Sequence, residues 1–174
     1  MKNKIDFKAL TLMDAYDIAI LIEQEACERY REFASLIGAR YEGDAGDFFS
    51  EMAGFEALHA KSLSERRQKL FGDKEKKVTA AMIWNVEAPE ENRPRTYMSV
   101  RQAYAVALES EQKAYDFFNQ ALSQVTDEET RVLFKELREE EAEHKKKLLE
   151  KLKSVPEGDG PDLTDDDIDE PPQI

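Results

Sequence analysis

A single cysteine, Cys27, sets the first limit on what this 174-residue chain can be. One thiol cannot form an internal disulfide, and it cannot supply a Cys-x-x-Cys redox or metal motif. Glycine and proline are also scarce, with seven and six residues respectively. Because both residues interrupt helices, their scarcity in a chain that is 36% charged favours long helices around a modest core.

Long apolar runs and an excess of positive charge are also missing. No stretch approaches the roughly 20 apolar residues of a membrane span, and residues 1–6 lack the apolar segment of an export signal. The net charge of −13 disfavours nucleic acid and anionic membrane surfaces as partners. We therefore expect a cytoplasmic protein whose one thiol stays reduced.

Only two histidines occur, and both stand in the same short motif. Glu56-x-x-His59 returns 85 residues later (141 − 56) as Glu141-x-x-His144. Residues three apart lie on one face of a helix, about one turn apart. A carboxylate and an imidazole placed in this way can bind the same metal ion, so the repeated motif predicts a metal site.

Two other segments repeat each other without histidine, around Glu23 and, 88 residues later (111 − 23), around Glu111. Each glutamate lies in the middle of an apolar stripe with the spacing of a core-facing helix. A carboxylate that points into a core is strongly disfavoured unless its charge is compensated. Neither stripe contains lysine or arginine, so a bound cation is the simplest explanation.

The pattern predicts an all-α four-helix bundle of two antiparallel hairpins joined by a long crossover. The expected helices span about residues 11–37, 49–70, 99–125 and 126–153. Thr11 and Ser99 each begin a capping box, and Gly38 is a typical end for the first helix. Segment 71–98 is long enough to let the second and third helices run parallel; a flexible interdomain linker is the alternative.

Residues 1–153 are expected to form one domain, followed by an acidic, disordered tail at 154–174. This tail contains eight acidic residues and no basic residue. We expect it to increase solubility, with a docking segment as the alternative.

Six inward-facing side chains are the predicted ligands of a two-metal centre. They are Glu23, Glu56, His59, Glu111, Glu141 and His144. Four carboxylates balance the charge of two divalent cations, and this ligand pattern is that of ferritin-like bundles that hold two iron or manganese ions. Imidazole ligands suit iron. We expect Glu56 and Glu141 to bridge the ions; which histidine binds which ion stays open.

Short patterns in all four predicted helices also coincide with those of a known family. The matching positions are Glu23, Ala26, Arg29, Tyr30, Phe33 and Ala34, then Phe49, Met52, Ala53, Glu56, His59 and Ala60, then Glu111, then Phe134, Leu137, Glu141 and His144. Their spacing resembles the bundle helices of the rubrerythrins, and the resemblance covers about residues 11–153.

The resemblance implies a ferritin-like fold with a non-haem di-iron centre that reacts with hydrogen peroxide or oxygen. It implies two iron ions, with manganese or zinc as substitutes, and we expect a homodimer. Rubrerythrins also carry a rubredoxin domain with four cysteines, which this chain cannot build. Electrons would have to come from a separate donor, such as a rubredoxin-type protein. Where rubrerythrins have an additional glutamate one turn after the third-helix ligand, this chain has Ala114.

Tyr30 is the candidate catalytic residue. It lies two turns beyond Glu23 on the same helix face, where its hydroxyl could hydrogen-bond a ligand carboxylate or the oxidant. A core tyrosine is the alternative interpretation. Cys27, on the same stripe, is expected to be a small buried hydrophobic residue.

Two other functions compete with the di-iron oxidoreductase. A ferroxidase or iron-storage subunit of the bacterioferritin type would use the same site, although Ala57 replaces the methionine that usually binds haem beside Glu56. A bundle whose inward acids bind nothing would require two duplicated coincidences. The sequence leaves open whether the protein forms a dimer or a cage, and whether the hairpins are exchanged between two chains.

Overall fold

The computed structural model describes residues 5–38, 40–83, 86–90 and 97–157. Its elements are a 3-10 turn η1 (Phe7–Ala9), four long helices α1 (Leu12–Ile37), α2 (Ala45–Phe71), α4 (Val100–Leu122) and α5 (Glu128–Leu152), and a short helix α3 (Ala80–Ile83). The prediction of an all-α fold is confirmed. Most of the predicted acidic tail, residues 158–174, lies outside the described residues.

The predicted capping signals begin and end the helices as expected. The Thr11 hydroxyl accepts a hydrogen bond from the Asp14 amide, and the Asp14 carboxylate accepts one from the Thr11 amide, which completes the capping box of α1. Ser99 and Gln102 form the same arrangement at α4. Gly38 has a φ of 70°, and its amide donates to the Ala34 carbonyl at the end of α1.

The boundary between α4 and α5 differs from the prediction by a few residues. α4 ends at Leu122 rather than near Val125. Val125 follows the helix, and its amide donates to the Ala121 carbonyl. The N-cap of α5 is Asp127, whose Oδ2 accepts from the Thr130 amide at 2.8 Å. The first turn therefore begins at Glu128, two residues later than the expected start.

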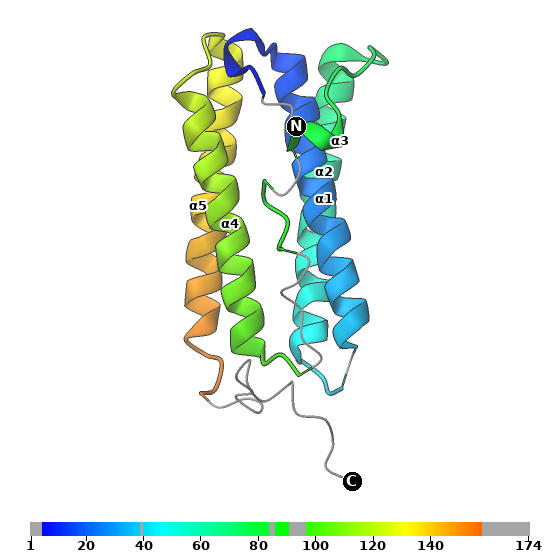
Figure 1. The fold of residues 1–174 in the computed structure, drawn as a ribbon, viewed down its shortest axis with the longest axis vertical. Helices are drawn as coiled ribbons and strands as arrows, with labels where there is room; N and C mark the ends of the chain where they lie inside the picture. The colour runs from blue at the N-terminus through cyan, green and yellow to red at the C-terminus, as the bar shows by residue number, and fades with distance from the viewer. Residues whose placement is uncertain (1–4, 39, 84–85, 91–96, 158–174) are drawn as a thin grey trace.

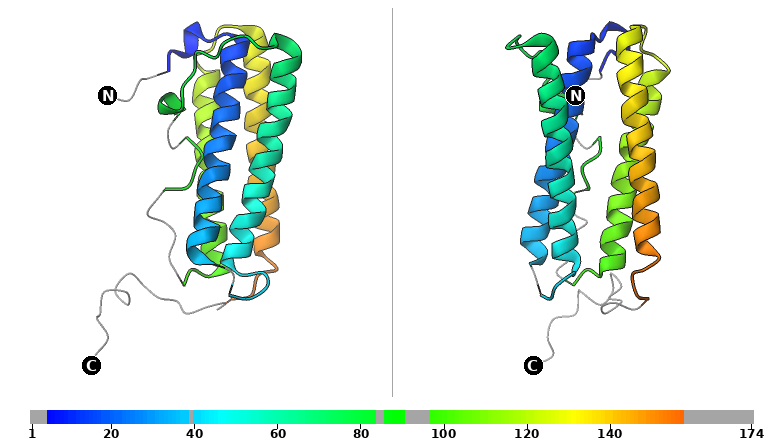
Figure 2. Two further views of the ribbon diagram at one scale, coloured as in Figure 1. Left: turned by 90° about the vertical axis from the view of Figure 1, so that its right-hand side faces the viewer. Right: turned by 180° about the vertical axis from the view of Figure 1, so that it is seen from behind.

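α1 and α2 pack along each other as one antiparallel hairpin, and α4 and α5 form the other (Figure 1). α2 and α4 run in the same direction, as the long crossover allows. The described parts of the crossover lie over the seam between α1 and α4 (Figure 2). These features establish a ferritin-like bundle. Among the described residues, none of the helices combines the length and apolar character that a membrane crossing requires.

The crossover packs against the bundle instead of behaving as a flexible interdomain linker. Val78 and Ile83 are buried in the apolar cluster at one end of the bundle. Met98 is buried in the cluster at the other end. The described parts of the crossover therefore belong to the same folded domain as the helices.

The apolar core is divided into two separate clusters by a polar layer. One cluster contains Ile22, Leu63, Phe118 and Leu137, and the second contains Tyr30, Phe49, Ala107 and Leu148. On each long helix, the predicted metal ligands lie in the sequence between the residues of the two clusters. The helices therefore place all their inward-facing acids at one level of the bundle.

Candidate metal centre

The first half of the site comes from the α1–α2 hairpin. Glu23 projects from α1, and Glu56 and His59 project from successive turns of α2. His59 Nδ1 lies 3.5 Å from Glu23 Oε2 and 3.4 Å from Glu56 Oε2. Both carboxylates are buried, whereas about a third of the imidazole is exposed (35%).

The second half repeats this geometry on the other hairpin. His144 Nδ1 lies 3.2 Å from Glu111 Oε2 on α4 and 3.6 Å from Glu141 Oε2 one turn earlier on α5. Glu111 and Glu141 are buried, and the imidazole is 21% exposed. In each half, the three potential ligand atoms lie within 4.8 Å of one another.

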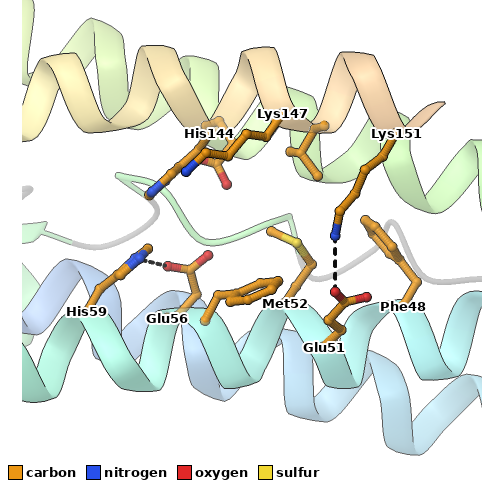
Figure 3. A pocket seen from close by; sticks show the side chains of 11 residues that line it. Phe48, Glu51, Met52, Glu56, His59, His144, Lys147 and Lys151 are labelled. Carbon is orange, nitrogen blue, oxygen red and sulfur yellow. Dashed lines mark hydrogen bonds and ion pairs between the residues drawn. The ribbon is translucent and has the colours of Figure 1, made fainter. Parts of the chain in front are cut away.

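The two halves face each other across the interface between the hairpins. The rings of His59 and His144 are stacked, with centroids 4.7 Å apart and planes inclined by 6° (Figure 3). The structure thus brings all six sequence-predicted side chains together. Two Glu-Glu-His groups at this separation suggest a dinuclear metal site; which atoms bind metal stays a prediction.

A fifth carboxylate, which the sequence analysis missed, joins this cluster. Glu87 lies on the crossover and is 1% exposed. Its carboxylate forms one group with Glu23 and Glu141 and another with Glu56 and Glu111, each within 4.8 Å. No helical period marks this position. The one available signal is that Glu87 is an acid flanked by the apolar residues Val86, Ala88 and Pro89.

Burial and mutual repulsion strongly perturb these carboxyl groups. Burial, followed by the charge of Glu56, raises the pKa of Glu23 well above its usual value. The same two causes raise the pKa of Glu87. Without a cation, burial and the neighbouring charges therefore favour the protonated form of Glu23 and of Glu87.

In the second Glu-x-x-His pair, the pKa values of both Glu141 and His144 are shifted. Burial is the main reason why the pKa of Glu141 rises to about 8, against the lowering effect of His144. Burial disfavours the charged imidazolium, yet the hydrogen bonds to Glu111 and Glu141 raise the pKa of His144 to about 10. Without metal, His144 holds a proton at pH 7, and a metal ion would displace it.

The donor set fits a pair of metal ions. Four of the carboxylates have a buried Oε2 atom without a hydrogen-bond partner among the described residues; they are Glu23, Glu56, Glu87 and Glu141. In the same part of the chain, none of the five carboxylates pairs with lysine or arginine. Buried acids without a lysine or arginine partner are costly unless other cations compensate them, and oxygen and imidazole ligands suit iron and manganese.

A pocket of about 150 Å³ leads from the surface to this cluster, between α2 and α5. Its inner wall includes ligand candidates from both halves, namely Glu56, His59, Glu111 and His144. Phe48, Met52, Phe55 and Leu148 make much of the remaining wall apolar. An ion pair between Glu51 and Lys151, 3.1 Å long, spans its outer end (Figure 3).

Tyr30 is completely buried and stacks on Phe49, with ring centroids 5.8 Å apart. Its hydroxyl has no hydrogen-bond partner among the described residues, and the hydroxyl of neighbouring Ser110 donates to the Val106 carbonyl. Burial and then the charge of Glu111 raise the pKa of Tyr30 well above its usual value. The hydroxyl therefore keeps its proton and is available as a donor at the level of the cluster.

Comparison with known proteins places this geometry among related bundles. The family model described as Rubrerythrin matches residues 14–152. An uncharacterized conserved protein from Magnetospirillum magnetotacticum is 27% identical, with a TM-score of 0.68 over 89% of this chain and 100% of that chain. A hypothetical protein from Pyrococcus furiosus shares the fold, with 21% identity and a TM-score of 0.51 over 83% of this chain and 89% of that one. No curated protein matches.

Proposed function

The chain belongs to the rubrerythrin family, and from that premise we propose that it is a di-iron oxidoreductase that reduces hydrogen peroxide or oxygen. One observation carries the proposal: the pocket ends at ligand candidates from both Glu-x-x-His motifs. An oxidant in this pocket would meet both metal positions at once. For peroxide, two electrons and two protons convert one molecule to two molecules of water.

The residues that would hold the metal are the two Glu-Glu-His groups described above. Glu23, Glu56 and His59 would hold one ion, and Glu111, Glu141 and His144 the other, with Glu56 and Glu141 as the bridges we propose. A bound iron pair supplies two reducing equivalents, one per ion. The protein's part is to fix the ligands on four helices and to keep their carboxylates buried between two apolar clusters.

The pocket selects the oxidant by size and polarity. Its volume of about 150 Å³ admits several molecules of the size of water or hydrogen peroxide. The apolar side chains of Phe48, Met52 and Leu148 limit the number of ordered waters near the carboxylates. Small neutral molecules such as hydrogen peroxide and oxygen fit these walls.

Tyr30 contributes a proton donor on the inner side of the site. The residue does not line the pocket, so we propose that its hydroxyl donates to a ligand carboxylate rather than to the oxidant. Glu111 is the acceptor we favour, since its charge is the strongest electrostatic influence on Tyr30 after burial. A donor at this point would hold the carboxylate in one orientation as the charge of the metal pair changes.

Electrons would reach the centre from a separate one-electron carrier, such as a rubredoxin-type protein, because the chain's only cysteine is buried in the bundle. We propose a homodimer as the working form. Sizing would separate this form from a storage cage, for which the expected particle is much larger.

Metal analysis of purified protein, followed by oxidation of the reduced centre with peroxide or oxygen, tests the proposal. We expect two iron ions per chain and faster oxidation by peroxide than by oxygen. The double variant His59→Ala/His144→Ala should lose bound iron while keeping its helicity by circular dichroism. Glu141→Gln should lose metal, whereas Glu140→Gln removes the same charge from an exposed neighbour and serves as the matched control. Two retained metals in the double-histidine variant would overturn the assignment.

A further inference from the structure

Glu87 differs from the other acids of the cluster in the element that carries it. The other four glutamates lie on the long helices, whereas Glu87 lies on the crossover, over the seam between α1 and α4. The pocket opens on the other seam, between α2 and α5. Glu87 therefore enters the site from the side opposite the pocket, and it is absent from the pocket wall.

Two basic side chains hold the backbone directly after Glu87. Arg29 Nη1, from α1, donates to the Pro89 carbonyl at 2.7 Å, and Lys113 Nζ, from α4, donates to the Ala88 carbonyl at 2.8 Å. Arg29 is buried. Lys113 is partly buried, and this burial lowers its pKa. Placing two cations in such surroundings costs free energy, so the position of this peptide is strongly specified.

Glu87 Oε2 is buried and has no hydrogen-bond partner in the described chain. A carboxylate oxygen of Glu87 lies within 4.8 Å of ligand atoms from both hairpins. If this acid were protonated, its hydroxyl would need an acceptor from another carboxylate of the cluster, and no such hydrogen bond is formed in the described chain. A cation among the five carboxylates would satisfy Glu87 Oε2.

We propose that Glu87 is a fifth carboxylate ligand of the two-metal centre, supplied by the crossover and positioned by Arg29 and Lys113. The proposal rests on the proposed function, because it requires that metal binds here. Glu87 shares one group of ligand atoms with Glu23 and Glu141 and another with Glu56 and Glu111, so it reaches both halves of the site.

A fifth carboxylate changes the charge balance of the centre. Four carboxylates neutralise two divalent ions and leave two positive charges on two trivalent ions. Five leave one negative charge on the divalent pair and one positive charge on the trivalent pair. Glu87 thus stabilises the oxidised pair relative to the reduced pair, and its removal raises the reduction potential.

The test compares Glu87→Gln with Glu90→Gln, which removes the same charge from an exposed residue of the same segment. Affinity for Co²⁺ and Fe²⁺ is measured by calorimetry, coordination by the visible spectrum of the Co²⁺ form, and the potential by redox titration. We expect Glu87→Gln to weaken binding of at least one ion by about tenfold or more, to alter the Co²⁺ spectrum and to raise the potential. Glu90→Gln should match the wild type.

Hydrogen exchange of the wild-type protein gives a second measurement that needs no variant. Saturating Co²⁺ should protect the amides of Glu87 and Ala88. Unchanged affinity and spectrum in a folded Glu87→Gln variant would overturn the proposal, as would metal-independent exchange of this peptide. If the wild type binds no metal, the proposed function itself fails. If it binds two ions that His59→Ala/His144→Ala loses but Glu87→Gln retains at full affinity, only the role of Glu87 fails.

Discussion

Asp17 and Arg67 form a buried ion pair that joins α1 to α2 near the end of the hairpin. Arg67 Nε donates to Asp17 Oδ1 at 2.9 Å, and the same guanidinium donates to the carbonyls of Gly72 and Lys74. Asp17 is 0% exposed and Arg67 is 5% exposed. The aspartate therefore depends on this one arginine for its charge compensation within the described chain.

Replacing Arg67 with methionine should destabilise the protein strongly. Arg67→Met leaves Asp17 as an uncompensated buried charge, which typically costs about 3–5 kcal/mol. The double variant Asp17→Leu/Arg67→Met removes both charges and should lose less stability than the single variant. Urea unfolding of the three proteins measures the difference. A double variant that is less stable than Arg67→Met would show that the pair contributes little beyond its packing.

Tyr30→Phe should separate catalysis from stability. The change removes a buried hydroxyl that has no partner in the described chain. The free energy of unfolding of the metal-free variant should therefore equal that of the wild type or exceed it by up to about 1 kcal/mol. Metal content should stay at the wild-type level, while peroxide-driven turnover falls. Thermal unfolding, metal analysis and stopped-flow oxidation test these outcomes. Full turnover in the variant would make Tyr30 a core tyrosine without a catalytic role.

The sequence predicted the site residues on the helices because residues three or four apart in the sequence lie on the same face of a helix. Glu23 and Glu111 were visible as acids within apolar stripes, and His59 and His144 as members of a repeated motif. Glu87 has no such period, since it lies on an irregular segment whose path depends on contacts with Arg29 and with α4. Its position depends on the tertiary structure rather than on local sequence.

At the scale of the element, the turn between α1 and α2 is closely packed where it meets Gly46. Gly46, in the first turn of α2, faces the carbonyl group of Gly38 so closely that a Cβ atom would overlap with its oxygen. Gly54, two turns further along the same helix, has no atom within 4 Å of the corresponding position. The two glycines therefore offer a matched pair of substitutions.

Gly46→Ala and Gly54→Ala should change stability in opposite directions. Gly46→Ala forces the backbone of the turn to move, at a cost of about 1–3 kcal/mol. Gly54→Ala should stabilise α2 by up to about 1 kcal/mol, because alanine has the higher helix propensity. Thermal and urea unfolding measure both. A neutral Gly46→Ala variant would mean that the turn can relax more easily than its packing indicates.

Asp44, the N-cap of α2, should make the stability of the protein depend on pH. Burial of Asp44 opposes its charge, yet hydrogen bonds from the backbone amides of Arg40 and Asp47 lower its pKa below 3.8. A carboxyl group with a lowered folded-state pKa contributes stability above its unfolded pKa and loses it as pH falls through the folded pKa. Asp44→Asn, which resembles the protonated acid, should be less stable than the wild type by about 1 kcal/mol at pH 7.

This difference should shrink as the pH falls below about 4, because the wild-type carboxyl group then becomes protonated. Urea unfolding between pH 3 and pH 7 measures it. A constant difference across that range would place the effect in the geometry of the cap and not in its charge.

Helix ends were predictable where a local motif determines them. Thr11 and Ser99 begin helices at the expected positions because a capping box involves only residues three apart. The end of α4 was placed too late, since Val125 continues the apolar pattern into the turn. Periodicity reports which residues are buried, and a buried turn residue has the same signature as a buried helical one.

At the scale of the whole molecule, the two hairpins meet through two apolar clusters, with the acidic layer between them. Each hairpin packs closely within itself, and the contacts between hairpins are fewer. Metal ions shared by Glu56 and Glu111, or by Glu23 and Glu141, would join the hairpins directly. The bundle should therefore depend on its metal for more of its stability than its helix packing indicates.

Metal removal should lower the melting temperature. A metal concentration of about 100 times the dissociation constant adds about 2.7 kcal/mol to the native state. In a domain of this size that corresponds to a shift of roughly 5–10 °C. Differential scanning calorimetry with saturating Fe²⁺, and again with a chelator, measures it. The His59→Ala/His144→Ala variant is the control and should melt at the same temperature in both conditions.

The acidic layer also bears on how long each copy of the protein survives. Since it separates the apolar residues into two clusters, either end of a metal-free molecule can open without disturbing the other. Cations in the layer couple both ends into one cooperative unit. Cellular proteases act on locally opened chains. We therefore expect copies that have not acquired metal to be degraded first, so that metal supply would govern the abundance of the protein.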